Sequence, residues 1–315
     1  MASSVQPTTL SSPRPNLIPP RELESFVRTL DLFFEKLQTA NQDGDPSFLE
    51  HYFALCNTDS MSFADLVRAL CHTRLWQGFE VLDNPYPKLC QDFADSVEHT
   101  TQVMQAEPAY HSRAHFKDVC LALSALASQA HYVAARKEPD QQWHLSPEDW
   151  WILFFCAIAH DYGHPGTRNQ TPFELEKYAV ELTQEFLLRH SYPLSKIKAL
   201  MADLEPIVLA TDPRYFDTLN RKFLKHDHPN SRADVMGLLL VEADLFASAL
   251  PKRGTYLGEQ LAKEWESSDS KLAQIVKSLA GRTQFLEGIT FYSPHARRLQ
   301  IETIRLKSIQ ELKAN

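Results

Sequence analysis

Apolar residues recur along this chain at intervals of three and four, the spacing of a helix with one buried face. Near the start of the chain one such face is formed by Phe26, Leu30, Phe33, Phe34 and Leu37. Few segments alternate between apolar and polar residues, and the chain has only nine glycines. The pattern therefore predicts an all-α protein, a compact multi-helix bundle.

The clearest predicted helix begins after Ser146. Serine is a favoured N-cap, and Pro147 suits the first helical position, with two acidic residues next in line. The following run WWILFFCAIA (150–159) is apolar on every side, so we expect this helix at the centre of the core. It is expected to stop at Gly163 and Pro165-Gly166.

The same spacing predicts further helices, and turn-forming residues mark the loops between some of them. The helices are expected at 173–190, 195–210, 231–250, 255–281 and 295–311, with loops at 41–47 and 83–88.

Residues 1–20 are rich in Ser, Thr and Pro and are expected to form a disordered tail. Residues 21–315 are expected to form one helical catalytic domain, in which the helices of 21–100 pack on a core formed by 101–315.

Composition narrows the function. A net charge of −8 argues against nucleic acid as a partner, although a free nucleotide remains possible beside a bound metal. No basic and apolar leader is present, and the longest apolar run is half the length needed to cross a bilayer, so no membrane partner is expected. Five scattered cysteines without a CxxC pair indicate buried thiols in a reducing, cytoplasmic location.

Histidine and aspartate gather in two strings, YHSRAHFKDV and AHDYGHPGTRN. His111 and His115 are four residues apart and share a helix face, a spacing that a solvated surface could also show. His160 and Asp161 close the apolar run, and His164 follows one turn later. A carboxylate there is costly unless a cation pairs with it. Because imidazole suits zinc and carboxylate suits magnesium or manganese, these residues predict a metal-dependent hydrolase.

A further ligand is expected from another helix. Asp244 lies in the apolar segment GLLLVEADLFASAL (237–250), with Glu242 as its only acidic neighbour. An exposed acid on an amphipathic helix is the alternative, but the surrounding core positions favour a buried role for Asp244.

Four strings in order, the two above followed by LATD (209–212) and ADLFAS (243–248), resemble class I 3′,5′-cyclic-nucleotide phosphodiesterases. These enzymes are an all-helical branch of the HD-domain hydrolases. The resemblance covers roughly residues 100–295, and HDxxHPGxxN is its most specific part.

The resemblance implies a site with two divalent metals. His115, His160, Asp161 and Asp244 would bind the tighter ion, usually Zn²⁺, and Asp161 would bridge to Mg²⁺ or Mn²⁺. A hydroxide between the metals would attack phosphorus in line. His111 resembles the general acid that protonates the departing 3′-oxygen, a task that suits imidazole.

Other residues are implied by the same resemblance. His164 is similar to a residue beside the phosphate, and Tyr110 is expected to contact the substrate. Thr211 would order metal-bound water. Glu176 is the acid expected to follow the second string, although the segment from Asn169 to this residue is shorter than in animal members of the family.

The base pocket departs most from the family. Gln284 is similar to the glutamine that hydrogen-bonds the purine, because an amide offers both donor and acceptor. Phe285 could place a ring against the base. However, Glu287 occupies the position at which the family has the phenylalanine that clamps the base, and Ser112 occupies the position of an asparagine in the family's motif.

The resemblance therefore implies hydrolysis of cAMP, cGMP or another cyclic nucleotide to the 5′-monophosphate. Two alternatives stay open: another HD-domain phosphohydrolase acting on nucleotides or a different phosphoester, and a non-catalytic nucleotide sensor. Substrate preference, regulation and oligomeric state have no signature in this sequence.

Overall fold

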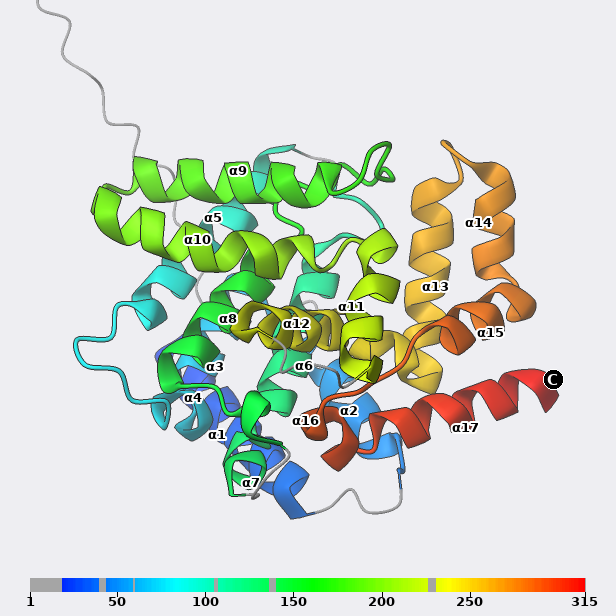
Figure 1. The fold of residues 1–315 in the computed structure, drawn as a ribbon, viewed down its shortest axis with the longest axis horizontal. Coiled ribbons are helices and arrows are strands. Elements are labelled where there is room, and N and C mark those ends of the chain that lie inside the picture. Colours follow the sequence, from blue (N-terminus) through cyan, green and yellow to red (C-terminus); the bar gives the residue numbers. More distant parts are fainter. Residues whose placement is uncertain are drawn as a thin grey trace, which may run out of the picture.

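The computed structural model describes residues 19–39, 44–58, 60–104, 107–135, 140–225 and 231–314. Within these ranges every regular element is a helix, which confirms the predicted all-α class (Figure 1). The tail expected at 1–20 lies outside the described residues except for its last two positions. None of the described helices combines the length and the apolarity needed to cross a membrane.

The helices are numbered in chain order. They are α1 (Pro20–Thr39), α2 (Ser47–Cys56), α3 (Phe63–His72), α4 (Arg74–Gln77), α5 (Tyr86–Met104), α6 (Arg113–Ala127), α7 (Ala130–Ala134), the 3₁₀ turn η1 (Asp140–Trp143), α8 (Pro147–Ala159), α9 (Glu174–Arg189), α10 (Leu194–Leu209), α11 (Pro213–Lys225), α12 (Arg232–Ala249), α13 (Pro251–Trp265), α14 (Ser270–Lys277), α15 (Leu279–Gly288), α16 (Pro294–Arg298) and α17 (Ile301–Ala314).

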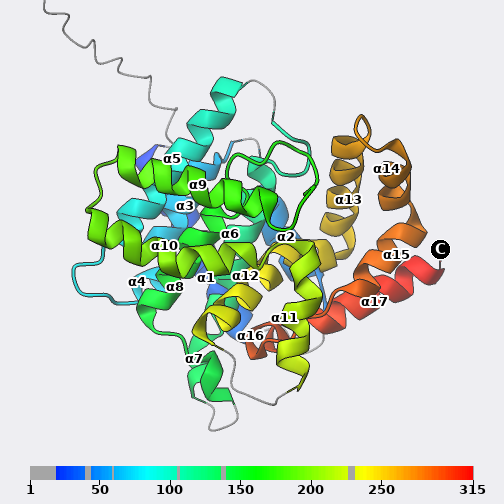
Figure 2. The same ribbon diagram turned by 45° about the horizontal axis from the view of Figure 1, so that its top comes forward.

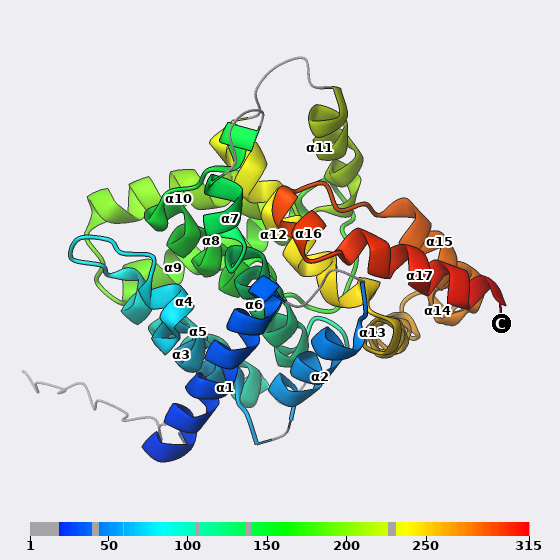
Figure 3. The same ribbon diagram turned by 90° about the horizontal axis from the view of Figure 1, so that it is seen from below.

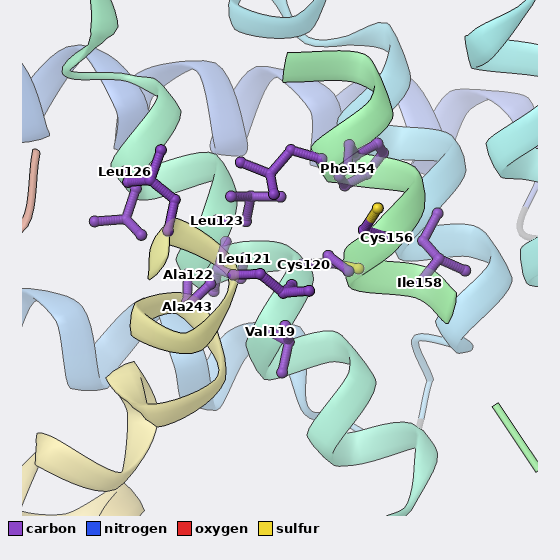
Figure 4. Close-up of a cluster of buried hydrophobic side chains, with 14 of the residues drawn as sticks. Val119, Cys120, Leu121, Ala122, Leu123, Leu126, Phe154, Cys156, Ile158 and Ala243 are labelled. Atoms are coloured by element: carbon purple, nitrogen blue, oxygen red, sulfur yellow. The ribbon is translucent and has the colours of Figure 1, made fainter. Parts of the chain in front are cut away.

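Three helices, α6, α8 and α12, form the centre of the molecule and contact one another. Figure 4 shows where they meet, with Cys120 of α6 facing Cys156 of α8, and Ala122 of α6 beside Ala243 of α12. These side chains are buried, as are the larger ones around them, and each buried Val, Leu, Ile or Phe contributes about 1.5–3 kcal/mol by leaving water. This apolar centre supplies the rigid support for the side chains at the helix ends.

The other helices cover this centre. Contacts join α3 to α5 and α6, and α5 to α8, so the N-terminal helices pack on one side, seen from below in Figure 3. The pair α9 and α10 packs against α8 and α12. Beyond α12, α13 and α14 lie side by side and α15 contacts α17, forming the part drawn in orange and red in Figure 2.

The start of α8 has the predicted N-cap at Ser146, and the structure adds a capping box. Ser146 Oγ accepts a hydrogen bond from Asp149 N–H at 3.2 Å, and the Asp149 carboxylate accepts one from Ser146 N–H at 2.8 Å. The helix ends at Ala159, before the expected stop at Gly163, whose left-handed φ of 77° suits a residue without a side chain. The histidine and aspartate after Ala159 therefore lie where the chain leaves the core.

Two predicted helices are wrong in extent. The segment 255–281 is not one helix, because α13 ends at Trp265 and α14 and α15 follow as separate helices. Asp269 and Ser278 cap the new N-termini by accepting from Leu272 N–H and Gly281 N–H.

The segment 295–311 likewise divides into α16 and α17. The break falls at Gln300, whose φ of 57° is incompatible with a continuous right-handed helix. Side-chain caps and a single left-handed residue thus override the apolar spacing in both segments.

Candidate metal centre

Side chains from three elements converge at one point. His115 comes from the first turn of α6, His160 and Asp161 follow α8, and Asp244 comes from α12. His115 Nε2 lies 3.3 Å from Asp161 Oδ2, 3.1 Å from Asp244 Oδ1 and 3.3 Å from His160 Nε2. His160 Nε2 lies 3.1 Å from Asp161 Oδ2 and 3.9 Å from Asp244 Oδ1. Two imidazole nitrogens and two carboxylates therefore face the same small volume.

The backbone of α8 orients one of these rings. His160 Nδ1 lies 3.0 Å from the carbonyl oxygen of Ala157, so the ring donates its Nδ1–H there and directs the lone pair of Nε2 into the cluster. Metal-binding histidines are commonly held in this way.

The pKa values of side chains in this cluster are shifted strongly from their usual range. Burial disfavours the charged form of His115, but the carboxylates of Asp161 and Asp244 outweigh burial and raise the pKa of His115 to about 10. Burial also works against ionisation of Asp161, yet His160 and His111 lower its pKa well below the usual range. Imidazole and carboxylate are the donors of a divalent ion that accepts nitrogen and oxygen. The ligand atoms of His115, His160 and Asp161 lie close enough together to hold one ion, and Asp244 approaches the same group through its contact with His115.

A second group shares Asp161. The ligand atoms of His111, Asp161 and His164 lie within 4.8 Å of one another. The rings of His111 and His164 are stacked, with centroids 3.5 Å apart. Asp161 thus lies between two groups of possible ligands, the position that a bridging carboxylate would need.

His164 is held in its neutral form. Burial, and then the neighbouring His111, lower the pKa of His164 to about 4. Its Nδ1 accepts a hydrogen bond from Gly166 N–H at 3.1 Å. A neutral ring that accepts at Nδ1 carries its proton on Nε2, so His164 can donate one hydrogen bond to an anion.

Glu264 of α13 is a residue that sequence reasoning missed. Its Oε1 lies 2.6 Å from His111 Nδ1, and its Oε2 accepts from the N–H groups of Tyr110 at 2.8 Å and His111 at 3.1 Å. Burial works against its charge, but these bonds from His111 lower the pKa of Glu264. No local signal in the sequence separates Glu264 from the exposed Glu259 and Glu266 of the same segment.

A cavity of about 460 Å³ opens over these side chains, within the size range of small-molecule sites. His111, His115, Asp161, His164 and Asp244 all line it. Of the four predicted metal ligands, His115, Asp161 and Asp244 therefore line one cavity, and the buried His160 lies behind them, against His115 and Asp161.

Three more expected residues line the same cavity. Tyr110 is placed with its hydroxyl beside Ser248, and burial raises the pKa of Tyr110 well above its usual value. Thr211 donates its hydroxyl to the carbonyl oxygen of Val208 at 2.8 Å. The carboxylate of Glu176 accepts from Asn169 Nδ2 at 3.1 and 3.0 Å, and burial raises the pKa of Glu176.

Asp212 was not singled out in the sequence, although it also lines the cavity. It is fully buried and accepts hydrogen bonds from Phe173 N–H at 2.7 Å and Arg214 N–H at 2.8 Å. The bond from Phe173 fixes the backbone directly before α9, the helix that carries Glu176. The adjacency of Asp212 to Thr211 in LATD is the one signal that could have indicated it.

The two residues expected to contact the base differ in position. Phe285 lines the cavity, with 44% of the residue exposed. Gln284 is exposed and is not among the lining residues. On α15 the residues that face the cavity are Gly281, Arg282 and Phe285, and a helix turns the intervening Gln284 to another side.

Known proteins share parts of this sequence and its fold. No family model matches the chain. A curated relative, 3′,5′-cyclic-nucleotide phosphodiesterase 2 of Saccharomyces cerevisiae, is 29% identical over 109 residues, which cover 30% of this chain and 20% of the yeast protein. The chain thus matches about a fifth of the length of that relative.

Solved structures match over much more of the chain. The phosphodiesterase domain of the Salpingoeca rosetta rhodopsin phosphodiesterase has a TM-score of 0.59 at 17% identity, covering 83% of this chain and 89% of that domain. The structure of LmjPDEB1 in complex with IBMX has a TM-score of 0.58 at 15% identity, covering 95% and 97%. The chain therefore has the fold of phosphodiesterase catalytic domains, and at the level of the fold the resemblance is confirmed.

Proposed function

We propose that this chain is a metal-dependent phosphodiesterase that hydrolyses 3′,5′-cyclic nucleotides, cAMP, cGMP or both, to 5′-nucleoside monophosphates. The observation that carries the proposal is the convergence of His115, His160, Asp161 and Asp244 beside a cavity that His111 also lines. The fold and the yeast relative support the same activity.

The metal ligands are assigned from the nitrogen and oxygen atoms that their side chains offer. His115, His160, Asp161 and Asp244 would hold the tighter ion, Zn²⁺, and Asp161 would share a second ion, Mg²⁺ or Mn²⁺. When bound, such ions would supply an activated water and offset charge on the phosphoryl oxygens.

His111 would act as the general acid. Its Nδ1–H is held by the Glu264 carboxylate, so a second proton on Nε2 is the one available for transfer to the departing 3′-oxygen. The negative charge of Glu264 stabilises this doubly protonated ring before transfer. After transfer the ring is neutral and keeps its bond to Glu264.

His164 would hold the phosphate in place. Since its ring is neutral and accepts from Gly166 at Nδ1, it offers an Nε2–H donor to a phosphoryl oxygen without adding charge. Thr211 and Glu176, which line the cavity, are suited to hydrogen bonding with water around the metals.

Product analysis tests the proposal. The purified chain would be incubated with cyclic and linear nucleotides in Mn²⁺ or Mg²⁺, with a chelator control, and the products separated by chromatography. We expect 5′-AMP or 5′-GMP from the cyclic substrates and no product with chelator. Release of inorganic phosphate would instead favour another phosphohydrolase, and binding of cyclic nucleotide without turnover would favour a sensor.

A further inference from the structure

The segment between α8 and α9 lies along the cavity and contributes Thr167, Arg168 and Asn169 to its lining. Its last residue before α9, Phe173, has a φ of 63°, in the left-handed region that residues with a side chain rarely adopt. Such a backbone persists only where the surrounding structure holds it. The contacts of Phe173 and its neighbours therefore decide how α9 begins.

Asp212, directly before α11, holds this backbone. Its Oδ2 accepts a hydrogen bond from Phe173 N–H at 2.7 Å, and its Oδ1 accepts one from Arg214 N–H at 2.8 Å. The second bond is that of an N-cap on α11. The first joins α11 to the start of α9, 39 positions earlier in the chain. Because Asp212 is fully buried, both of its oxygens need donors of this kind.

Arg214 and Asn169 make a second connection between the same two segments. Arg214 Nη2 donates to the carbonyl oxygen of Asn169 at 2.7 Å. The side-chain amide of Asn169 is used at both ends: Nδ2 donates to the carboxylate of Glu176 at 3.1 and 3.0 Å, and Oδ1 accepts from Leu175 N–H at 2.8 Å. Together with the two bonds of Asp212, these contacts form a closed network that joins the start of α11 to the first turn of α9.

The network ends at the carboxylate of Glu176, which lines the cavity although only 8% of the residue is exposed. Burial raises the pKa of Glu176, and the negative charges of Asp212 and Asp161 raise it further. The carboxylate therefore lies near Asp161, the residue placed between the two groups of possible metal ligands. This is the side of the cavity at which the proposed second ion would bind.

We propose, as an extension of the proposed function, that Asp212 and Arg214 are positioning residues, which hold the start of α9 so that Glu176 can hydrogen-bond water of the second metal ion. Neither acts on the substrate itself. The simpler role for Asp212 is to cap α11 alone. Asparagine caps a helix as well as aspartate does, so under that role Asp212→Asn would be neutral. Under the proposal it is not, because the Nδ2 donor of asparagine would face one of the two backbone donors.

Binding of Mn²⁺ without substrate tests the proposal, because it needs no turnover. The full chain, loaded with zinc, would be titrated with Mn²⁺, and free Mn²⁺ followed by electron paramagnetic resonance. We expect Asp212→Asn to raise the dissociation constant about 3–10-fold, the range of one net hydrogen bond, while the zinc content stays unchanged. Asp45→Asn, at an exposed acid that accepts from Ser47 N–H, is the matched control.

Two further comparisons separate positioning from a general loss of stability. If Asp212 acts through Glu176, Asp212→Asn should weaken Mn²⁺ binding no further in a Glu176→Gln background. If it acts by holding the left-handed backbone, Phe173→Gly should restore binding in Asp212→Asn, because glycine adopts a positive φ without strain. Phe173→Ala loses the same aromatic ring but keeps the strain, so it should not restore binding. A purely structural role predicts neither result.

Unchanged Mn²⁺ binding in Asp212→Asn would overturn the inference and leave the proposed function intact. Equal binding in the two double variants, with glycine or alanine at position 173, would overturn it too. If Asp212→Asn does not fold, Arg214→Ala decides in its place, because it keeps the backbone N–H that caps α11 and loses only the bond to Asn169. A wild type that turns over cyclic nucleotides without binding Mn²⁺ would overturn the inference alone. One that does neither would end the proposed function as well.

Discussion

The carboxylate of Glu264 lies 2.6 Å from Nδ1 of His111, a contact between residues 153 positions apart in the chain. The same carboxylate binds the backbone N–H groups of Tyr110 and His111. One buried acid on α13 therefore fixes both the ring and the backbone of the residue that we assign as general acid. Its position depends on how α13 packs, and not on the string that contains His111.

Replacing Glu264 with Gln should impair proton transfer without removing the metal. The amide keeps the size of the side chain but loses the charge that stabilises protonated His111. We expect kcat for cyclic nucleotides to fall about 10–100-fold, less than the ~10²–10⁴-fold of a whole general acid. Glu259→Gln, exposed on the same helix, is the control, and an unchanged kcat in Glu264→Gln would contradict the assignment.

His111→Ala separates the roles of acid and metal ligand. Removal of the ring should keep the metal content and lower kcat for cAMP or cGMP by about 10²–10⁴-fold, because the 3′-oxygen is a poor leaving group without a proton. A p-nitrophenyl phosphodiester needs little protonation and should lose much less. The measurement is kcat on both substrates beside metal analysis. Equal losses on both would rule out a general acid at this position.

Asp244→Ala should remove a metal and not only activity. Asp244 Oδ1 lies 3.1 Å from His115 Nε2, so its carboxylate is placed to complete the ligand set with His115, His160 and Asp161. We expect the zinc content after dialysis to fall, together with activity, while His111→Ala retains the metal. Elemental analysis of the two variants, prepared in parallel, decides this. Full metal content in Asp244→Ala would remove Asp244 from the ligand set.

His295 should make the folded state sensitive to acid. The ring is fully buried, neither nitrogen has a hydrogen-bond partner in the described structure, and it packs against Trp150 with centroids 5.4 Å apart. Burial, and then nearby His144, lower the pKa of His295 from 6.5 to about 3. Since the unfolded chain binds the proton more tightly, this contribution to stability is complete above pH 6.5 and is lost as the pH falls toward 3.

The free energy of unfolding in urea, measured across this pH range, tests that expectation. His295→Phe removes the titrating group and should flatten the decline between pH 6.5 and pH 4 relative to the wild type. His131→Gln, at an exposed histidine, should decline as the wild type does. Parallel curves for wild type and His295→Phe would show that another group causes acid unfolding.

Local patterns in the sequence were enough for the helical class and for the start of α8. The capping residues Ser146 and Pro147 act within one turn, and an apolar run on all sides can be stable only inside a core. The same local reasoning failed for 255–281, where the caps at Asp269 and Ser278 divide the apolar pattern into three helices. The helical spacing of apolar residues cannot reveal where one helix ends and the next begins when the helices on both sides of the boundary bury the same face.

The candidate site was likewise predictable from the sequence only in part. His160, Asp161 and Asp244 could be singled out from the sequence, because acids within or beside an apolar segment are costly unless they bind something. The family resemblance added His115, whose spacing from His111 a solvated surface could also show. The sequence alone therefore indicated which residues carry the candidate chemistry. The convergence of α6, α8 and α12, the contact of Glu264 with His111, and the outward turn of Gln284 were decided by tertiary packing. Contacts between residues far apart in the chain depend on the angles at which helices pack, and no local pattern encodes those angles.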